Sequence, residues 1–261
     1  MLYKNLSGYF REKYGKRLKK ICVDGGFSCP NRDGVCGVGG CIYCGERGAG
    51  EHISAALSIE EQVKSVIDSA DDDSLFIAYF QNFTNTYAPV EILKQRYDRA
   101  LIDDRIRILS IGTRPDCISP EVCDLIASYL DRVDVWVELG LQTSSDEIGS
   151  IINRGYTTDV YVRACQLLKD YGIPFVTHMI IGLPYQTDTD VFDTVDLINE
   201  SGSFGIKIHS MYVMKGTALE KMYGQEEYAP ISMEKYADLC AECISRLRDD
   251  MIVHRIRASK D

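Results

Sequence analysis

The sequence predicts an α/β protein with a parallel sheet, and two observations lead to that class. Apolar runs of strand length alternate with helical patterns along the chain, and such alternation is typical of βαβ units. The runs are nearly continuous, as expected where both faces of a sheet are buried. Six strands with helices outside would form an incomplete (β/α) barrel or an open doubly wound sheet. Both architectures carry their functional residues at the carboxyl ends of the strands.

Local signals predict the individual elements. Ser58 and Glu61 form the pattern of a capping box, Ser119 with Pro120 indicates a second helix start, and Pro89 lies near the first turn of a third helix. The predicted strands cover residues 17–25, 74–81, 106–116, 132–143, 174–184 and 205–213, with a short last strand over 251–256. The predicted helices cover residues 58–70, 89–102, 119–131, 144–152, 158–171, 188–201, 217–223 and 232–249.

Length and composition narrow the class of protein. The 261 residues contain no low-complexity linker and 45% of them are hydrophobic, which suits a globular enzyme with one main domain. No run approaches the roughly 18 apolar residues of a membrane-spanning helix, and the N-terminus lacks the apolar core of a secretory signal. We therefore expect a cytoplasmic protein with no membrane contact. In that compartment clustered thiols stay reduced, which favours metal binding or catalysis over disulfides.

The first 20 residues differ from the rest in charge. They hold seven Lys or Arg and one acid, a net charge of +6, whereas the whole chain carries −10. The overall charge argues against non-specific coating of nucleic acid, but a local basic segment with aromatic residues suits a phosphate backbone and exposed bases. The other interpretation is an amphipathic helix whose aromatic side chains pack on the domain. We predict a basic aromatic segment over residues 1–20 and the main domain over 21–261.

Thiols are concentrated in the loop after the first predicted strand. The stretch "CPNRDGVCGVGGCIYC", from Cys29 to Cys44, holds four of the ten cysteines. Cys41 and Cys44 are spaced like half of a structural zinc site, but Cys29 and Cys36 make a poor second pair. The three thiolates of Cys29, Cys41 and Cys44 instead suit a [4Fe–4S] cluster with one iron left open for a ligand. The intervening glycines let the backbone wrap closely round a bulky group.

Five motifs at successive strand ends resemble those of the radical S-adenosylmethionine (radical SAM) superfamily. They are "CPNRDG…GVGGCIYC", "YFQNFTNTYAP", "GTRPD", "ELGLQT…NRGY" and "HMIIGLPYQT". Within the superfamily they resemble the YhcC/YtqA-like group, which is related to the catalytic subunit of Elongator. The resemblance covers nearly the whole chain and implies a partial (β/α)6 TIM-like barrel with a basic N-terminal extension. It also implies a [4Fe–4S] cluster on Cys29, Cys41 and Cys44, and reductive cleavage of SAM to a 5′-deoxyadenosyl radical.

The resemblance further implies a set of SAM contacts. Where relatives carry glycines before the residue that receives the SAM amino group, this chain has Gln81, Asn82 and Phe83. Taken without the family, each of the contact residues also has an ordinary structural interpretation, such as a strand-end cap, a salt-bridge partner or a core histidine. The implied contacts are Tyr43 near the adenine, Thr84 at the amino group, Gln142 and His178 at the ribose, and Arg154 at the carboxylate.

The resemblance suggests tRNA as the substrate, at the 5-substituent of the wobble uridine. The basic aromatic N-terminus agrees with the hypothesis of a tRNA substrate, because proteins stack unpaired bases of RNA loops on aromatic side chains. An electron donor such as flavodoxin or ferredoxin would supply the reducing electron. Two alternatives remain open, a radical SAM enzyme that acts on a small metabolite and a non-enzymatic module stabilised by zinc.

The other cysteines carry less information. Cys240 and Cys243 form a CxxC pattern on a predicted helix and are expected to be buried core thiols rather than a second metal site. Cys22 and Cys36 are near enough in sequence to the three ligands to be candidates for a catalytic thiol. The remaining cysteines, which lie in helical or strand-end patterns and are expected in the core, are Cys117, Cys123 and Cys165.

Overall fold

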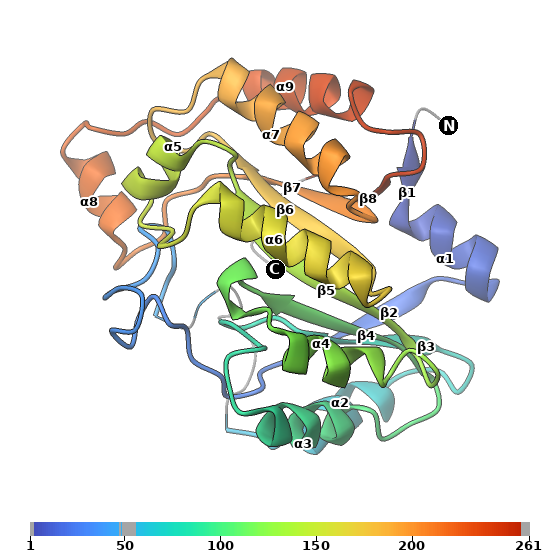
Figure 1. The fold of residues 1–261 in the computed structure, drawn as a ribbon. Helices are drawn as coiled ribbons and strands as arrows, with labels where there is room; N and C mark the ends of the chain where they lie inside the picture. The colour runs from blue at the N-terminus through green and yellow to red at the C-terminus, as the bar shows by residue number, and fades with distance from the viewer. Residues whose placement is uncertain (1–2, 47, 49–55, 257–261) are drawn as a thin grey trace.

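The fold is organised around a curled parallel sheet. The computed structural model describes residues 3–46, 48 and 56–256. In this part of the chain the sheet has eight strands in the order β1-β8-β7-β6-β5-β4-β3-β2, and every neighbouring pair is parallel (Figure 1). The strands are β1 Lys4–Asn5, β2 Leu18–Val23, β3 Leu75–Phe80, β4 Ile106–Thr113, β5 Asp134–Gln142, β6 Phe175–Ile181, β7 Gly205–Ser210 and β8 Ile252–Arg255.

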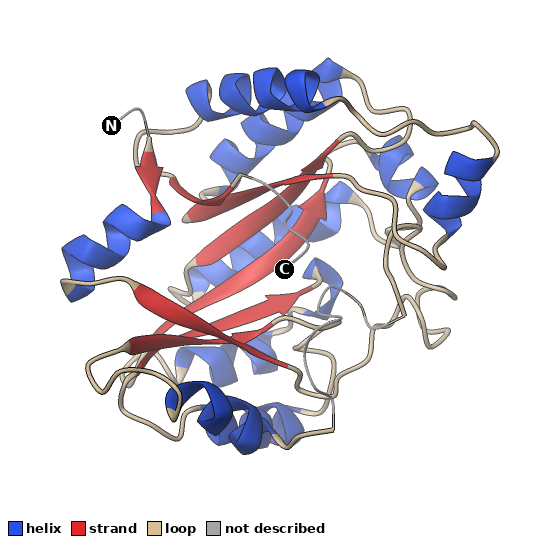
Figure 2. Cartoon of the chain, turned by 180° about the vertical axis from the view of Figure 1, so that it is seen from behind, coloured by secondary structure: helices blue, strands red, loops and turns tan. Residues whose placement is uncertain are grey.

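Most of the helices follow the outer side of the curved sheet. The view from behind shows the strands in front of the helices (Figure 2). Because a doubly wound sheet carries helices on both faces, the one-sided cover confirms the partial barrel. None of the helices in the described part of the chain has the length and hydrophobicity of a membrane-spanning segment. The helices are α1 Leu6–Tyr14, α2 Ile59–Ile67, α3 Val90–Ala100, α4 Pro120–Ala127, α5 Asp146–Ile151, α6 Thr158–Asp170, α7 Asp188–Ser201, α8 Ala218–Gly224 and α9 Met233–Ser245.

Two predicted helix starts are confirmed by their caps. The Ser58 side chain accepts from the backbone N–H of Glu61, and the Glu61 carboxylate accepts from the backbone N–H of Ser58 at 2.7 Å, which completes the capping box of α2. Ser119 caps α4, with Pro120 at its first position. These starts were predictable because a cap is a local interaction between residues three or four apart.

Helix ends are less well predicted than helix starts. The helix predicted to end at residue 102 stops at Ala100, and the helix predicted to end at 249 stops at Ser245. Leu101 and Leu247 follow these ends and continue the apolar pattern, but they pack against the core from the connecting segments. An apolar pattern therefore marks burial and does not by itself mark helix.

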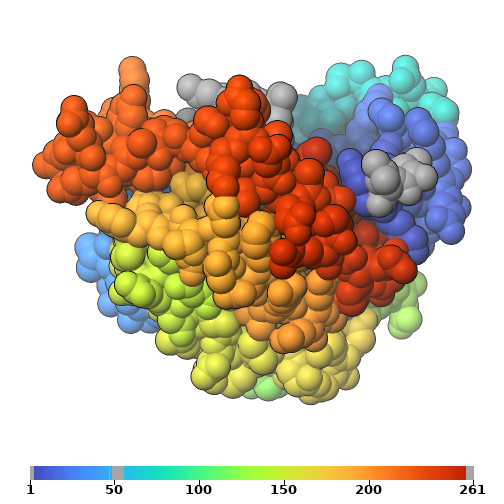
Figure 3. Space-filling view, turned by 90° about the horizontal axis from the view of Figure 1, so that it is seen from above, coloured from blue at the N-terminus to red at the C-terminus, as the bar shows by residue number. Residues whose placement is uncertain are grey.

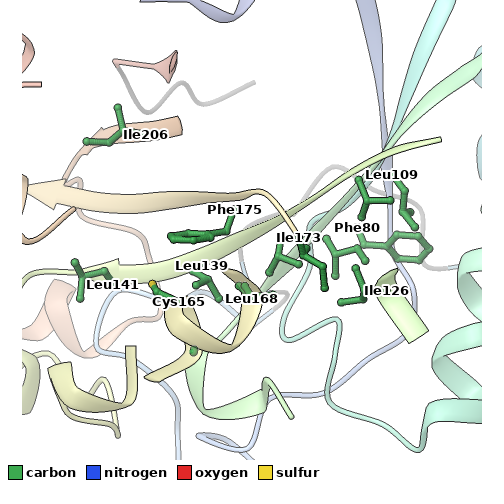
Figure 4. Close-up of a cluster of buried hydrophobic side chains, with 14 of the residues drawn as sticks. Phe80, Leu109, Ile126, Leu139, Leu141, Cys165, Leu168, Ile173, Phe175 and Ile206 are labelled. Atoms are coloured by element: carbon green, nitrogen blue, oxygen red, sulfur yellow. The ribbon is translucent and has the colours of Figure 1, made fainter. Parts of the chain in front are cut away.

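The strands place alternate side chains in two separate cores. On β5 the outer core between sheet and helices takes Val135, Val137, Leu139 and Leu141, while Trp136 belongs to a second cluster on the inner face. Figure 4 shows Leu139 and Leu141 with Phe175 of β6 and with Cys165 and Leu168 of α6. Burial in the outer core confirms the predicted core role of the cysteines Cys123, Cys165, Cys240 and Cys243, whereas Cys117 is only partly buried and lies outside the core clusters.

The N-terminal segment bridges the two edges of the sheet. β1, which the sequence pattern did not predict, pairs with β8 at one edge, and β2 forms the opposite edge. The space-filling view shows the N-terminal residues in blue beside the C-terminal residues in red (Figure 3). Between β1 and β2, α1 inserts Phe10 against Trp136 on the inner face, with stacked rings 6.4 Å apart. The packing interpretation of this segment is therefore confirmed for Phe10, whereas RNA contact stays a prediction.

Candidate active site at the carboxyl ends of the strands

The cysteine loop leaves the carboxyl end of β2 and is tied down by the segment after α5. The backbone N–H of Ile42 donates to the Ile152 carbonyl at 3.1 Å, and the Asn153 amide donates to the Gly40 carbonyl at 2.7 Å. Gly40 has φ +81°, and a Cβ there would lie 2.9 Å from the Arg32 side chain. The loop therefore depends on a glycine at this point, where its backbone turns closely around Arg32.

The cysteines at positions 41 and 44 form a coupled pair of thiols. A hydrogen bond between them lowers the pKa of Cys41 to about 6, against the effect of burial, and the Arg114 charge acts in the same direction. The same contact raises the pKa of Cys44. The contact therefore favours the thiolate on Cys41 over the thiolate on Cys44. The thiolate is the form of cysteine that binds metals.

The donor set at this loop fits a [4Fe–4S] cluster. Cys29, Cys41 and Cys44 are all free thiols of intermediate exposure. Within the described residues, no three His, Cys, Asp or Glu side chains converge as one metal ion would require. A [4Fe–4S] cluster binds each thiolate at a different iron, so its ligands stand further apart than those of a single ion. Three thiols on one glycine-rich loop at the strand ends are the chemistry that the cluster needs.

Thr84 lies next to the cysteine loop. Its backbone N–H donates to the carbonyl of Ser28, the residue before Cys29, at 3.1 Å. The side chain is almost completely buried, and its hydroxyl has no hydrogen-bond partner among the described residues. A buried polar group without a partner is costly unless a ligand satisfies it. This position is compatible with the predicted contact to the SAM amino group.

Gln142 ends β5 in an unusual conformation. Its φ is +71°, and the pairing of β5 with β6 shifts register between Gly140 and Gln142. The side chain folds back over Gly140, where an added Cβ would lie 2.6 Å from the Gln142 amide nitrogen. The Tyr156 hydroxyl donates to the Gly140 carbonyl from the same region. The Gln142 amide therefore occupies the space that a side chain at position 140 would take.

Tyr43 lies between the second and third cysteines and beside Tyr156. Burial raises the pKa of Tyr43 well above its ordinary value, and the neighbouring Cys41, Cys44 and Tyr156 add to the effect. The ring packs against a small apolar cluster that includes Ile152 and Ile180. Tyr43 and the Gly140–Gln142 segment therefore both lie near Tyr156, and the contact of Tyr43 with the adenine stays a prediction.

Arg154 is positioned differently from the prediction. Its side chain is 1% exposed, and all five of its N–H donors are directed at groups of this chain. As placed here, the guanidinium has no donor left for a SAM carboxylate, so such a contact would require these bonds to rearrange. The acceptors are the carbonyls of Leu141, Thr143 and Tyr156, the Asp146 carboxylate and the Thr158 hydroxyl.

His178 lies on the inner face of β6 and forms part of a network that the sequence analysis missed. Its Nε2 is 2.8 Å from Glu138 of β5, and Lys207 of β7 contacts the same carboxylate oxygen. Both partners are almost fully buried. The signal in the sequence was a charged residue between apolar neighbours in a strand, Glu138 in "VWVELGL" and Lys207 in "GIKI". Charged residues are rarely buried unless they are paired.

Comparison with known sequences identifies relatives over nearly the whole chain. Protein YhcC of Escherichia coli (strain K12) is 36% identical over 253 residues, which span 97% of this chain and 82% of that protein. Uncharacterized protein YtqA of Bacillus subtilis (strain 168) is 36% identical over 258 residues, 97% of this chain and 80% of that protein. A tRNA uridine(34) acetyltransferase of Methanocaldococcus jannaschii is 31% identical over 141 residues, 52% of this chain and 25% of that protein.

Two solved structures share the fold. The archaeal Methanocaldococcus infernus Elp3 with an N-terminal deletion superposes with a TM-score of 0.73 at 19% identity, and the match covers 93% of this chain and 57% of that chain. Coproporphyrinogen III oxidase (HemN) from Escherichia coli gives a TM-score of 0.60 at 14% identity, over 91% of this chain and 54% of that chain. This chain therefore spans a little over half the length of each of these proteins.

Family models agree with these relatives. A model described as the Radical SAM superfamily matches residues 33–198, and one described as the Radical_SAM C-terminal domain matches residues 204–261. The first match covers more than half of the chain, and the 36% identity to YhcC extends over nearly all of it. The chain therefore belongs to the radical SAM superfamily, whose cofactors are a [4Fe–4S] cluster and SAM.

Proposed function

We propose that this protein is an enzyme that reductively cleaves SAM and directs the resulting 5′-deoxyadenosyl radical at tRNA, to remodel the 5-substituent of the wobble uridine. The observation that carries the proposal is the loop of Cys29, Cys41 and Cys44 at the carboxyl ends of a parallel half-barrel. When bound, the cluster supplies the electron that splits SAM, and an electron donor such as flavodoxin or ferredoxin reduces the cluster. The difficult chemistry belongs to the cofactors, and the protein positions them.

In this proposal each site residue has a separate task. Thr84 offers a buried hydroxyl beside Cys29 to the SAM amino group. Gln142 and His178 bind the ribose from the inner face, and Tyr43 packs near the adenine. We assign Arg154 to the architecture around the site, because its bonds join the end of β5 to the turn before α6. A contact of Arg154 with the SAM carboxylate would be secondary to that role.

The tRNA substrate is supported by a relative and by a surface. The partial match to a tRNA uridine(34) acetyltransferase includes about half of this chain. The basic segment lies at the amino ends of the strands, opposite the cysteine loop, and three of its cations are paired with acids: Lys13 with Asp134, Lys16 with Asp73 and Lys19 with Asp71. We propose that its remaining exposed cations contact the phosphate backbone, away from the base that reacts.

The cleavage reaction is tested on anaerobically reconstituted protein with dithionite and SAM. We expect 5′-deoxyadenosine by chromatography from the wild type and none from Cys41→Ala, because loss of one thiolate removes a cluster ligand. Iron and sulfide are measured on the same samples. One zinc per chain, with no iron or sulfide, would contradict the proposal and favour the zinc-stabilised module.

The RNA partner is tested with a charge variant and a matched control. Lys4, Arg11 and Arg17 are exposed cations of the basic segment, and changing all three to Gln should weaken tRNA binding. The slope of log K against log salt should become shallower by about two, since each lost phosphate contact removes roughly 0.7 to 0.9. The control changes three exposed cations of the outer helices, Lys64, Arg163 and Lys169, to Gln. Equal binding by both variants and the wild type contradicts an RNA contact at this segment.

A further inference from the structure

Three neighbouring strands place a charged network on the inner face of the half-barrel. Glu138 of β5, His178 of β6 and Lys207 of β7 lie side by side, since the register pairs His178 with Gly140 and with Lys207. One oxygen of Glu138 contacts both His178 Nε2, at 2.8 Å, and the Lys207 ammonium. The other oxygen accepts from the Ser110 hydroxyl at 2.7 Å. The carboxylate is therefore fully engaged.

The network determines which nitrogen of His178 carries a proton. A carboxylate can only accept, so Nε2 must donate to Glu138. Lys207 already neutralises Glu138, so a second positive charge on the imidazole is not needed. Burial, followed by the Lys207 charge, lowers the pKa of His178 below its ordinary value of 6.5. At neutral pH the ring is therefore uncharged, with its proton on Nε2 and a lone pair on Nδ1.

The Nδ1 atom of His178 is available to a ligand. The His178 side chain is 20% exposed, whereas those of Glu138 and Lys207 are 2% and 5% exposed. Nδ1 forms no hydrogen bond with any described residue. It is also absent from the set of side-chain atoms that are both buried and unpaired, so it is not buried. It therefore keeps access to the space inside the half-barrel. A lone pair held there accepts a hydrogen bond from a hydroxyl.

We propose that Lys207 and Glu138 are positioning residues that hold His178 with its proton on Nε2, so that Nδ1 accepts a hydrogen bond from a ribose hydroxyl of bound SAM. The identity of the ligand rests on the proposed function, and the protonation state does not. The arrangement parallels metal-binding histidines, whose second nitrogen is fixed by a carboxylate that sets the tautomer. Here the carboxylate is itself fixed, by a buried ammonium.

Other ionisable groups face His178 and enter any titration of it. They come from β2, β3, β5, β7 and β8, and the ring centroid of His209 lies 5.2 Å from that of His178. The groups are Lys20 of β2, Tyr79 of β3, Glu138 of β5, Lys207 and His209 of β7, and His254 and Arg255 of β8.

The protonation state is measured by ¹⁵N NMR on histidine-labelled protein with the cluster in its oxidised, diamagnetic state. The chain has four histidines, and His178→Gln assigns the signals of residue 178. We expect a protonated Nε2 and a bare Nδ1 at neutral pH. Addition of SAM should shift the Nδ1 signal upfield and leave Nε2 nearly unchanged. A proton on Nδ1, a doubly protonated ring, or an Nδ1 signal that saturating SAM does not move would overturn the proposal.

Lys207→Met tests the positioning role. Without the ammonium, Glu138 loses its buried counter-charge and His178 takes that place, so the pKa of His178 should rise by about one unit or more. Lys94→Met is the matched control, since Lys94 forms an exposed pair with Asp98 on α3, and it should leave the pKa of His178 unchanged. An equal pKa of His178 in both variants overturns the role of Lys207.

The double variant Glu138→Gln with Lys207→Met covers the case in which Lys207→Met does not fold, because it leaves no unpaired buried charge. Here His178 should populate both tautomers, and retention of a single Nε2-protonated form contradicts the proposal.

Equilibrium dialysis of SAM against His178→Gln should show affinity weaker by about fivefold, the effect of one hydrogen bond, and unchanged affinity contradicts the ligand assignment. The NMR experiment determines the tautomer without any turnover. A wrong tautomer would therefore contradict this proposal alone, whereas absence of 5′-deoxyadenosine would contradict the proposed function.

Discussion

At the scale of single residues, Arg154 shows how one side chain can organise the carboxyl ends of several elements. Its guanidinium joins two carbonyls at the end of β5 to the Tyr156 carbonyl, and its salt bridge to Asp146 adds the first turn of α5. Gly149 packs against the guanidinium so closely that an added Cβ would lie 2.9 Å from it. The charge is tolerated in this buried position because every donor is satisfied.

Arg154→Met should therefore be strongly destabilising. The change leaves two buried carbonyls and one part-buried carbonyl without this donor, and we expect the free energy of unfolding to fall by about 3 to 5 kcal/mol. Urea unfolding followed by circular dichroism measures it. Arg99→Met is the control, because Arg99 pairs with Glu60 at the surface and such pairs contribute about 1 kcal/mol or less. Equal stability of the two variants would contradict the architectural role.

Glu138 makes stability depend on pH in the acid range. Burial alone would raise its pKa, but the Lys207 charge and the hydrogen bond from His178 hold the pKa well below its ordinary value of 4.5. The unfolded chain takes up this proton near that ordinary value, while the folded chain does not. The stabilisation is therefore complete above that pH and is lost as the pH falls through the depressed pKa of the folded state.

We expect the free energy of unfolding of the wild type to decrease as the pH falls below about 4.5, the ordinary value for a glutamate. The double variant Glu138→Gln with Lys207→Met lacks this titration, so its decrease should be shallower. Urea unfolding at a series of pH values gives both curves. If the free energies of unfolding of the two proteins fall in parallel with pH, other carboxylates account for the whole loss of stability in acid.

At the scale of elements, α1 acts as a plug at the amino end of the half-barrel. Phe10 is 5% exposed and stacks on Trp136, and Tyr9 packs edge-on against Phe204 with ring centroids 5.5 Å apart. The Tyr14 hydroxyl donates to the Asp134 carboxylate at the start of β5. A helix of nine residues is too short to be stable alone, so this packing is what holds it.

Phe10→Ala should weaken the packing of α1 against the inner face of the half-barrel. Loss of a buried phenylalanine costs about 3 to 5 kcal/mol, and Trp136 is the single tryptophan of the chain. We expect a lower free energy of unfolding together with a red shift of the native fluorescence, because water reaches the indole. Arg11→Ala, at an exposed position of the same helix, should change neither. A stable variant with unshifted fluorescence would show that α1 does not seal this end.

At the scale of the whole molecule, the two family models meet inside one sheet. The first ends at residue 198 and the second begins at 204, yet β6 and β7 on either side of that boundary are paired along their length. The Lys207–Glu138 ion pair also crosses it. The two matches are therefore expected to form a single folding unit.

Equilibrium unfolding in urea tests this continuity. Trp136 reports on the inner face of β5, and far-ultraviolet circular dichroism reports on all helices. We expect coincident single transitions from the two probes, as for one cooperative domain. A fluorescence transition separated from the circular dichroism transition would indicate that the residues after 204 unfold independently.

The sequence determined the features that depend on near neighbours. The α/β order, the cap at Ser58 and the clustering of Cys29, Cys41 and Cys44 are set by residue spacing along a few turns of chain. They could be predicted because caps and strand or helix periods are local interactions. β1 escaped prediction because a strand of two residues has no period to recognise.

Tertiary structure alone decided the features that depend on register between distant strands. Glu138 and Lys207 are 69 residues apart in the chain, and they meet only because β5, β6 and β7 are paired in one particular register. The same register places His178 beside Glu138 and leaves Nδ1 of His178 open to a ligand. Sequence fixes which groups are available, whereas side-chain direction in a sheet alternates with each residue, so a shift of one would send these groups to the other face.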